Sequence, residues 1–165
     1  MRTIDNINRL NKSEFLSIFG NVFEKTESVA LKVFELKPFK DSDDIVSKML
    51  KIYEEYDRDK ILQILNSHPE LAIEKKLTNE SKLEQTSANL NECSEEEFEE
   101  FKKLNLEYKT KFGFPFIIAV KGKNKNEILV NFRERIQNDL NKEFLEAKNQ
   151  VKKIASFRLK YILSF

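Results

Sequence analysis

Apolar residues recur along this chain mainly at the spacing of one helix face. Two segments have apolar side chains three, four, seven or eight positions apart: Phe15, Phe19, Val22 and Phe23, and then Ile45, Met49, Ile52, Tyr53 and Tyr56. Side chains at these intervals lie on one side of an α-helix, where they can pack against a core. Both segments are therefore predicted to be amphipathic helices.

The C-terminal half repeats this pattern and adds a helix start signal. Ser94 and Glu97 have the spacing of a capping box, in which each side chain accepts a hydrogen bond from the other residue's backbone N–H. The helix that begins there has an apolar side made of Phe98, Phe101, Leu104 and Tyr108. Two more helices are predicted at about 126–136 and 141–163, the last with the apolar stripe Phe144, Ala147, Val151, Ile154, Ala155 and Ile162.

One apolar run, Phe116–Val120, does not follow helical spacing and lies among Gly113, Pro115 and Gly122. A single strand would have no neighbour to pair with, so we predict an extended segment threaded between helices. Its N–H and C=O groups would lack ladder partners, and a bound polar ligand is one way to satisfy them. The predicted fold is an all-α, single-domain bundle of about eight helices with one extended segment near 114–121.

Composition and charge exclude several function classes. The 165 residues are 40% hydrophobic and 35% charged with a net charge of +1, which gives no reason to expect a nucleic-acid partner. No stretch reaches the roughly 18 apolar residues of a membrane span, and the N-terminus lacks a signal peptide's apolar core. We therefore expect a cytoplasmic protein without membrane contact. The only cysteine, Cys93, cannot form an intrachain disulfide and is interpreted as a spare thiol.

His68 is the only histidine, and so the only side chain that ordinarily titrates near neutral pH. Pro69 disfavours helical backbone at His68, so the preceding helix should end near Ser67 and leave the imidazole at a break in the fold. There it could act as a proton donor. The alternative is a surface histidine, or one whose hydrogen bonds are satisfied within a loop.

Two further sets of polar residues could carry chemistry. Ser81, Glu84 and Gln85 are spaced to place a hydroxyl, a carboxylate and an amide on one helix face, although Ser81 and Glu84 also fit a capping box. Arg158 lies in line with the C-terminal apolar stripe. A buried guanidinium needs an anion, either a protein carboxylate such as Glu84 or a carboxylate of a ligand. The alternative is that its stem packs while its head reaches water.

Short motifs are spread over nearly the whole chain: Leu10–Phe15, Phe19–Glu24, Lys37–Phe39, His68–Ala72, Ser81–Gln85, Leu104–Asn105, Tyr108, Phe112–Gly122, Glu127–Leu129 and Ile154–Leu159. In this order and spacing they resemble the 2-oxo-4-hydroxy-4-carboxy-5-ureidoimidazoline (OHCU) decarboxylase family of urate breakdown. Ile73 and Asn89 stand where that family usually has glycine. Asn89 tolerates a left-handed backbone and Ile73 does not readily, so the turn after Ala72 is expected to be the main point of departure.

The resemblance implies an all-α homodimer, without cofactor or metal, whose single domain covers residues 1–165. It implies a carboxy-lyase that converts OHCU to (S)-allantoin, with His68 as the catalytic proton donor. We also place Glu84 in catalysis, where it would fix the tautomer and charge of the imidazole. Substrate contacts are implied for Pro69, Ser81, Lys82, Leu83, Glu84, Gln85, Phe116, Ile117, Ile118, Ala119, Val120 and Arg158.

No cofactor is expected because a ring imine in the substrate can take up the electron pair that departing CO2 leaves behind. A metal-dependent hydrolase is disfavoured because one histidine offers too few nitrogen ligands, although carboxylates could bind magnesium. The alternative from another class is a non-catalytic all-helical interaction domain, which predicts an intact fold without turnover.

Overall fold

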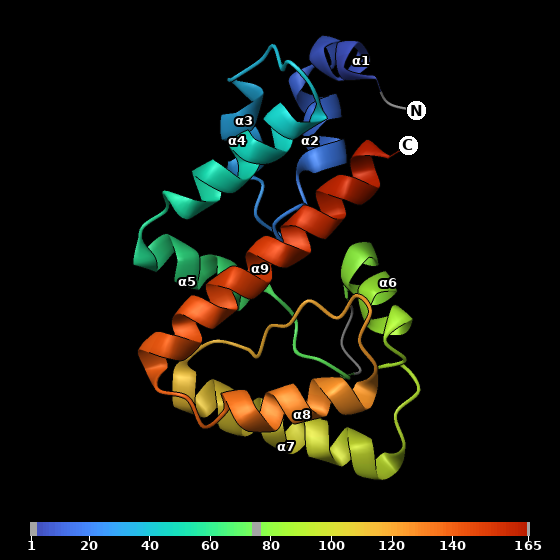
Figure 1. Cartoon of the computed structure of the whole chain (residues 1–165), viewed down its shortest axis with the longest axis vertical. Helices are drawn as coiled ribbons and strands as arrows, with labels where there is room; N and C mark the ends of the chain where they lie inside the picture. Colours follow the sequence, from blue (N-terminus) through green and yellow to red (C-terminus); the bar gives the residue numbers. More distant parts are fainter. Residues whose placement is uncertain (1–2, 74–76, 165) are drawn as a thin grey trace. The chain divides into compact units, whose positions relative to one another are not determined.

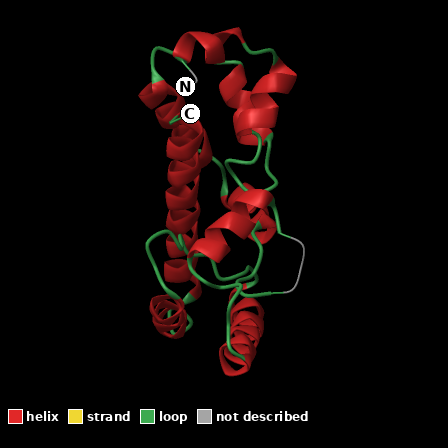
Figure 2. Cartoon of the chain, turned by 90° about the vertical axis from the view of Figure 1, so that its right-hand side faces the viewer, coloured by secondary structure: helices red, strands yellow, loops and turns green. Residues whose placement is uncertain are grey.

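The structure, a computed structural model, describes residues 3–73 and 77–164. These residues form nine α-helices and no strand (Figures 1 and 2). The helices are α1 (Ile4–Arg9), α2 (Lys12–Phe19), α3 (Ser28–Phe34), α4 (Ser42–Glu54), α5 (Arg58–Ser67), α6 (Asn79–Ser87), α7 (Glu95–Phe112), α8 (Lys125–Arg135) and α9 (Leu140–Leu163). The predicted all-α fold is confirmed, with one helix more than the expected eight. In the described part of the chain, no helix is both long and apolar enough to cross a membrane.

Local sequence signals determine several helix boundaries. Ser94 and Glu97 form the predicted capping box at the start of α7, and Gly113, whose φ of 78° is left-handed, caps the end of this helix after Phe112. A second capping box, between Asn124 and Glu127, starts α8. Such reciprocal hydrogen bonds satisfy backbone N–H groups that have no partner inside the helix.

The chain divides into two compact units. The first contains the described residues up to Ser67 and those from Lys152 onward, and the second contains those from His68 to Val151. Helix α9 contributes to both. The prediction of a single domain over residues 1–165 stays a prediction.

Aromatic side chains build the core of the first unit, where α3 packs against α2 and α4. The rings of Phe15 and Phe19 lie 4.6 Å apart, and Phe23 stacks on Tyr53 at 4.8 Å. All four side chains are buried. Val22 and Phe23 follow the end of α2, and Tyr56 follows the end of α4, so both predicted helices are shorter than their apolar stripes, although Phe23 still packs in the core.

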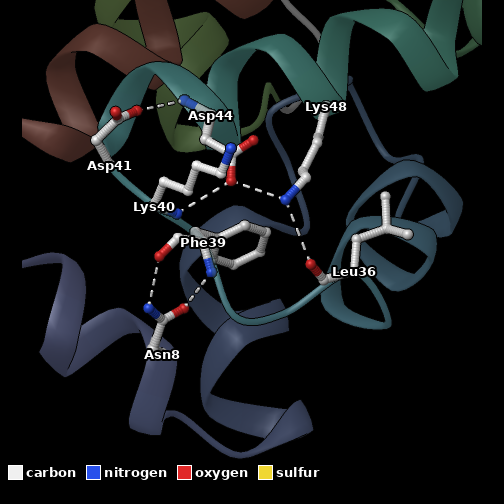
Figure 3. Close-up of polar contacts among 7 residues, drawn as sticks. All are labelled: Asn8, Leu36, Phe39, Lys40, Asp41, Asp44 and Lys48. Atoms are coloured by element: carbon white, nitrogen blue, oxygen red, sulfur yellow. Dashed lines mark hydrogen bonds and ion pairs between the residues drawn. The ribbon is translucent and has the colours of Figure 1, made fainter.

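The loop between α3 and α4 is fixed by polar contacts (Figure 3). The amide of Asn8 donates to the carbonyl of Phe39 at 2.9 Å and accepts from its N–H at 2.8 Å. Asp44 accepts from the N–H of Lys40 and pairs with the ammonium of Lys48 at 2.7 Å. The hydrogen bond from Lys48 lowers the pKa of Asp44. These contacts tie the loop to α1 and α4.

The core of the second unit is also aromatic and includes the predicted extended segment. Phe116 stacks on Phe132 of α8, with ring centroids 3.9 Å apart. Tyr108 of α7 meets Phe114, Phe116 and Phe132 edge to face. Residues 115–120 have no regular secondary structure and are buried. The extended segment is thus confirmed, and its aromatic contacts attach it to α7 and α8.

Candidate active site

The single histidine lies at the start of the second unit, directly after a helix end. Helix α5 ends at Ser67, as Pro69 predicts, and His68 is only 8% exposed. The surface-histidine alternative is therefore wrong. An imidazole buried at a helix break can exchange protons with a bound molecule while bulk water is kept away.

Two side-chain amides hold the turn that follows His68. The Nε2 of Gln85 donates to the carbonyl of Glu70 at 3.1 Å, while its Oε1 accepts from the N–H of Ala72 at 3.1 Å. The Nδ2 of Asn105 in α7 donates to the carbonyl of Leu71 at 3.0 Å. Three consecutive residues of this turn are therefore held through their backbone groups.

Ile73, one of the two residues that stand where the family usually has glycine, follows this turn, and the backbone angles show which residue is strained. Ala72 has a φ of 52° and Asn89 a φ of 58°, both left-handed, whereas Ile73 is not among the residues with positive φ. The strained residue is therefore Ala72 and not Ile73. Asn89 adopts the conformation that the sequence predicts for it, which short polar side chains tolerate.

Helix α6 separates the predicted substrate-contact residues into a buried and an exposed side. Thr78 caps the helix and accepts from the N–H of Ser81, so the capping-box alternative for Ser81 and Glu84 is wrong. Ser81 and Gln85 are buried and Glu84 is half-buried, whereas Lys82 and Leu83 are exposed, Leu83 by 67%. A buried polar side is present, and the Lys82 and Leu83 side chains do not belong to it.

Protein side chains form hydrogen bonds with some of the backbone N–H and C=O groups of the extended segment. Arg135 donates from one guanidinium nitrogen to the carbonyl of Ile117 at 2.7 Å, and Gln150 accepts from the N–H of Ala119 at 2.9 Å. These two groups therefore have protein partners, and the substrate contacts expected at Ile117 and Ala119 stay predictions. No hydrogen-bond partner for the N–H or the C=O of Ile118 lies among the described residues, although Ile118 is only 4% exposed. Binding of a polar ligand by these two groups stays a prediction.

A buried carboxylate, Glu143, supports Arg135. Glu143 is fully buried and accepts from the hydroxyl of Tyr108 at 2.5 Å, from Nε of Arg135 at 2.7 Å and from Asn138 at 2.9 Å. Burial, reinforced by the hydrogen bond to Glu143, raises the pKa of Tyr108 far above its usual value. The sequence analysis missed this network. Its signal was present, because Arg135 follows Phe132 by three residues on the apolar side of α8.

Arg158 is buried in the first unit, so the alternative with a solvated head is wrong. One guanidinium nitrogen pairs with Glu24 at 2.8 Å and another donates to the carbonyl of Asn21 at 2.9 Å. Glu24 is itself fully buried. The predicted need for an anionic partner is confirmed, and the partner is Glu24 in place of the suggested Glu84. A pocket shared by Arg158, Glu84 and His68 stays a prediction.

Comparisons with known proteins agree on one family. A family model described as OHCU decarboxylase matches residues 8–160. The 2-oxo-4-hydroxy-4-carboxy-5-ureidoimidazoline decarboxylase of Haloferax volcanii is 36% identical over 157 residues, covering 95% of this chain and 94% of that protein. A uric acid degradation bifunctional protein of Bacillus sp. (strain TB-90) is 38% identical over 98% of this chain. This chain spans 32% of the bifunctional protein's length.

The fold leads to the same family. A crystal structure of (S)-allantoin synthase aligns with 98% of this chain and 54% of that chain, with a TM-score of 0.79 and 25% sequence identity. A crystal structure of OHCU decarboxylase in the presence of (S)-allantoin aligns with 88% of this chain and 97% of that chain, with a TM-score of 0.74. At 24% identity, the second likeness concerns the fold.

Proposed function

Because the chain belongs to the OHCU decarboxylase family, we propose that it converts OHCU to (S)-allantoin and CO2 as a carboxy-lyase of urate breakdown. The observation that carries this proposal is the match to the Haloferax volcanii decarboxylase, which covers 94% of that protein as well as nearly all of this chain. A cytoplasmic homodimer is proposed on the strength of the family resemblance.

The reaction breaks the bond between the carboxylate carbon and its neighbouring ring carbon. The electron pair of that bond moves into the adjacent ring imine, CO2 leaves, and an enol-like intermediate forms. The imine nitrogen takes up a proton as CO2 leaves. A second proton then adds to the former imine carbon, which bears the ureido group, while the enol hydroxyl loses its proton and becomes the ring carbonyl of allantoin. We assign the delivery of the second proton to His68, and delivery to one face yields (S)-allantoin. The burial of His68 supports the assignment, because acid–base catalysis is effective where competing water is excluded.

The remaining polar groups have proposed roles in orientation. Glu84, half-buried on α6, fixes the tautomer and charge of His68. The N–H of Ile118 binds a ring oxygen of the substrate, and this role is supported by the lack of another partner among the described residues. Arg158 orients the substrate carboxylate, while Glu24 holds the guanidinium in place. The Ser81 hydroxyl and Pro69 complete the proposed substrate contacts.

The test uses freshly generated OHCU and follows the appearance of optically active allantoin by circular dichroism. Spontaneous decay of the substrate is subtracted with an enzyme-free control. His68→Asn is expected to lower the decarboxylation rate by about 10²–10⁴-fold, the range for loss of a general acid–base group. The exposed neighbour Asn66→Ala is the control and should keep the wild-type rate.

Two results would contradict the proposal. An undiminished rate in His68→Asn would remove the histidine from the mechanism. A wild-type protein that folds and yet matches the enzyme-free control would favour the non-catalytic interaction domain.

A further inference from the structure

We propose that Arg135 and Gln150 are positioning residues for the substrate-binding backbone at Ile118. Each side chain fixes one of the two peptide units that flank the Ile118 Cα, and so sets the direction of one polar group of Ile118. This inference rests on the proposed function and deepens it, because it names the side chains of α8 and α9 that shape this part of the substrate site.

The planarity of the peptide group links each of these side chains to a polar group of Ile118. The C=O of Ile117 and the N–H of Ile118 belong to one planar unit, and the C=O of Ile118 and the N–H of Ala119 belong to the next. Both units are trans. In a trans unit the C=O and the N–H point in opposite directions. A side chain that binds one of them therefore determines where the other points.

Arg135 fixes the first unit. One terminal nitrogen of its guanidinium donates to the carbonyl of Ile117 at 2.7 Å, so the N–H of Ile118 points away from this guanidinium. The Nε and the other terminal nitrogen lie 2.7 and 2.6 Å from one oxygen of the fully buried Glu143. The guanidinium carbon also lies 4.4 Å from the ring centroid of Phe116. Because the guanidinium is rigid and planar, these contacts fix the direction of the donor that holds Ile117.

Gln150 fixes the second unit. Its Oε1 accepts from the N–H of Ala119 at 2.9 Å, so the C=O of Ile118 points away from this amide. Its Nε2 donates to a carboxylate oxygen of Glu146, one turn earlier in α9, at 2.7 Å. A carboxylate accepts hydrogen bonds, so only one orientation of the amide makes both contacts. Gln150 is 7% exposed and is held at both ends of its amide.

Ile118 thus has two buried polar groups whose directions are set by its neighbours. It is 4% exposed, and neither its N–H nor its C=O has a hydrogen-bond partner among the described residues. Buried backbone groups without partners cost free energy, so a residue that has two of them calls for a ligand. OHCU carries both N–H and C=O groups and can supply both partners. Because the backbone is ordered before the substrate binds, little affinity is lost to reordering.

The test measures KM for freshly generated OHCU and the Kd of (S)-allantoin in Gln150→Met. Methionine keeps the length of the side chain and removes the acceptor for Ala119. Misdirecting one hydrogen bond to the ligand is expected to raise KM and Kd about 2–10-fold and to leave kcat within about twofold. The matched control is Gln137→Met, the same substitution at an exposed position, which should leave KM, Kd and kcat unchanged.

A rescue variant separates positioning from direct substrate contact. Gln150→Glu combined with Glu146→Gln exchanges the two groups, so the carboxylate accepts from Ala119 and from the new amide. This double variant is expected to have a lower KM than Gln150→Met. A KM that stays raised would mean that the substrate contacts Gln150 itself, and would overturn the proposal. A purely structural role predicts fewer active molecules, seen as a lower kcat with an unchanged KM, and that result would overturn it too.

Arg135→Lys tests the first peptide unit. Lysine keeps a positive charge beside Glu143 but lacks the rigid fork that also reaches Ile117, so KM is expected to rise about 2–10-fold here as well. An unchanged KM in this variant would overturn the role proposed for Arg135.

A measurement on the wild-type protein does not depend on the folding of any variant. Saturation with (S)-allantoin should shift the amide NMR resonance of Ile118, because its N–H gains a partner. The amide of Ala119 should be protected from hydrogen exchange both with and without (S)-allantoin. An Ile118 resonance that does not respond while the enzyme turns over OHCU would overturn this inference and leave the proposed function intact. Absence of turnover in the wild type would overturn the proposed function itself.

Discussion

The buried charge network around Glu143 makes a quantitative prediction. Glu143 is fully buried, lies 2.6 Å from a terminal nitrogen of Arg135, and also accepts from Tyr108. Glu143→Gln keeps the size of the side chain and removes its charge. Arg135, which is 7% exposed, would then hold a buried positive charge without its counter-ion.

Breaking one side of a buried ion pair costs about 3–5 kcal/mol in free energy of unfolding. For a chain of this length, about 1 kcal/mol shifts the melting temperature by about 2–4 °C, so a fall of about 6–20 °C is expected for Glu143→Gln. Tyr108→Phe removes one hydrogen bond to a charged group and should cost less, about 1.5–3 kcal/mol. The two effects should not add, because both residues act on one carboxylate.

The assay is urea unfolding at pH 7 followed by far-ultraviolet circular dichroism. The matched control is Glu100→Gln, which removes the carboxylate from an Arg–Glu pair at the surface, where Glu100 contacts Arg133. Exposed pairs contribute at most about 1 kcal/mol, so this variant should be nearly as stable as the wild type. If Glu143→Gln cost no more than Glu100→Gln, the reasoning about buried charge in this network would be refuted.

The remaining predictions concern other buried groups. Glu24→Gln should destabilise the protein by about 3–5 kcal/mol in urea titrations, and adding Arg158→Met should recover part of the loss; no recovery would contradict the pairing. Desolvation by burial raises the pKa of Tyr108 and Tyr53, so stability should decline above about pH 10, where the unfolded chain ionises both phenols and the folded chain does not. Unfolding curves unchanged up to pH 11 would count against this. Burial also raises the pKa of the Cys93 thiol, so a disulfide reagent should modify it more slowly in the folded than in the urea-unfolded protein, and equal rates would contradict this.

The helices could be predicted because their signals are local. The capping box at Ser94 starts α7 as predicted. The stripe that begins at Phe15 is the exception, because α2 ends at Phe19 and Val22 and Phe23 lie in the turn that follows. The partner of Arg158 could not be found in this way. Its apolar surroundings in the sequence indicate burial and hence a need for an anion, but Glu24 is 134 residues away in the chain. Only the tertiary fold selects one carboxylate among many.

The extended segment shows that the same reasoning, from a buried polar group to the partner it needs, could have predicted more of the structure. A buried segment without a strand neighbour needs other partners for its peptide groups. Arg135 and Gln150, polar residues on the buried sides of α8 and α9, serve Ile117 and Ala119 in place of ladder hydrogen bonds. Polar residues within apolar stripes therefore indicate which side chains will form hydrogen bonds with a buried backbone segment that has no strand neighbour. Arg135 and Gln150 hold the two peptide units on either side of the Ile118 Cα, through the C=O of Ile117 and the N–H of Ala119, so the backbone around Ile118 is fixed although its own N–H and C=O have no partner among the described residues.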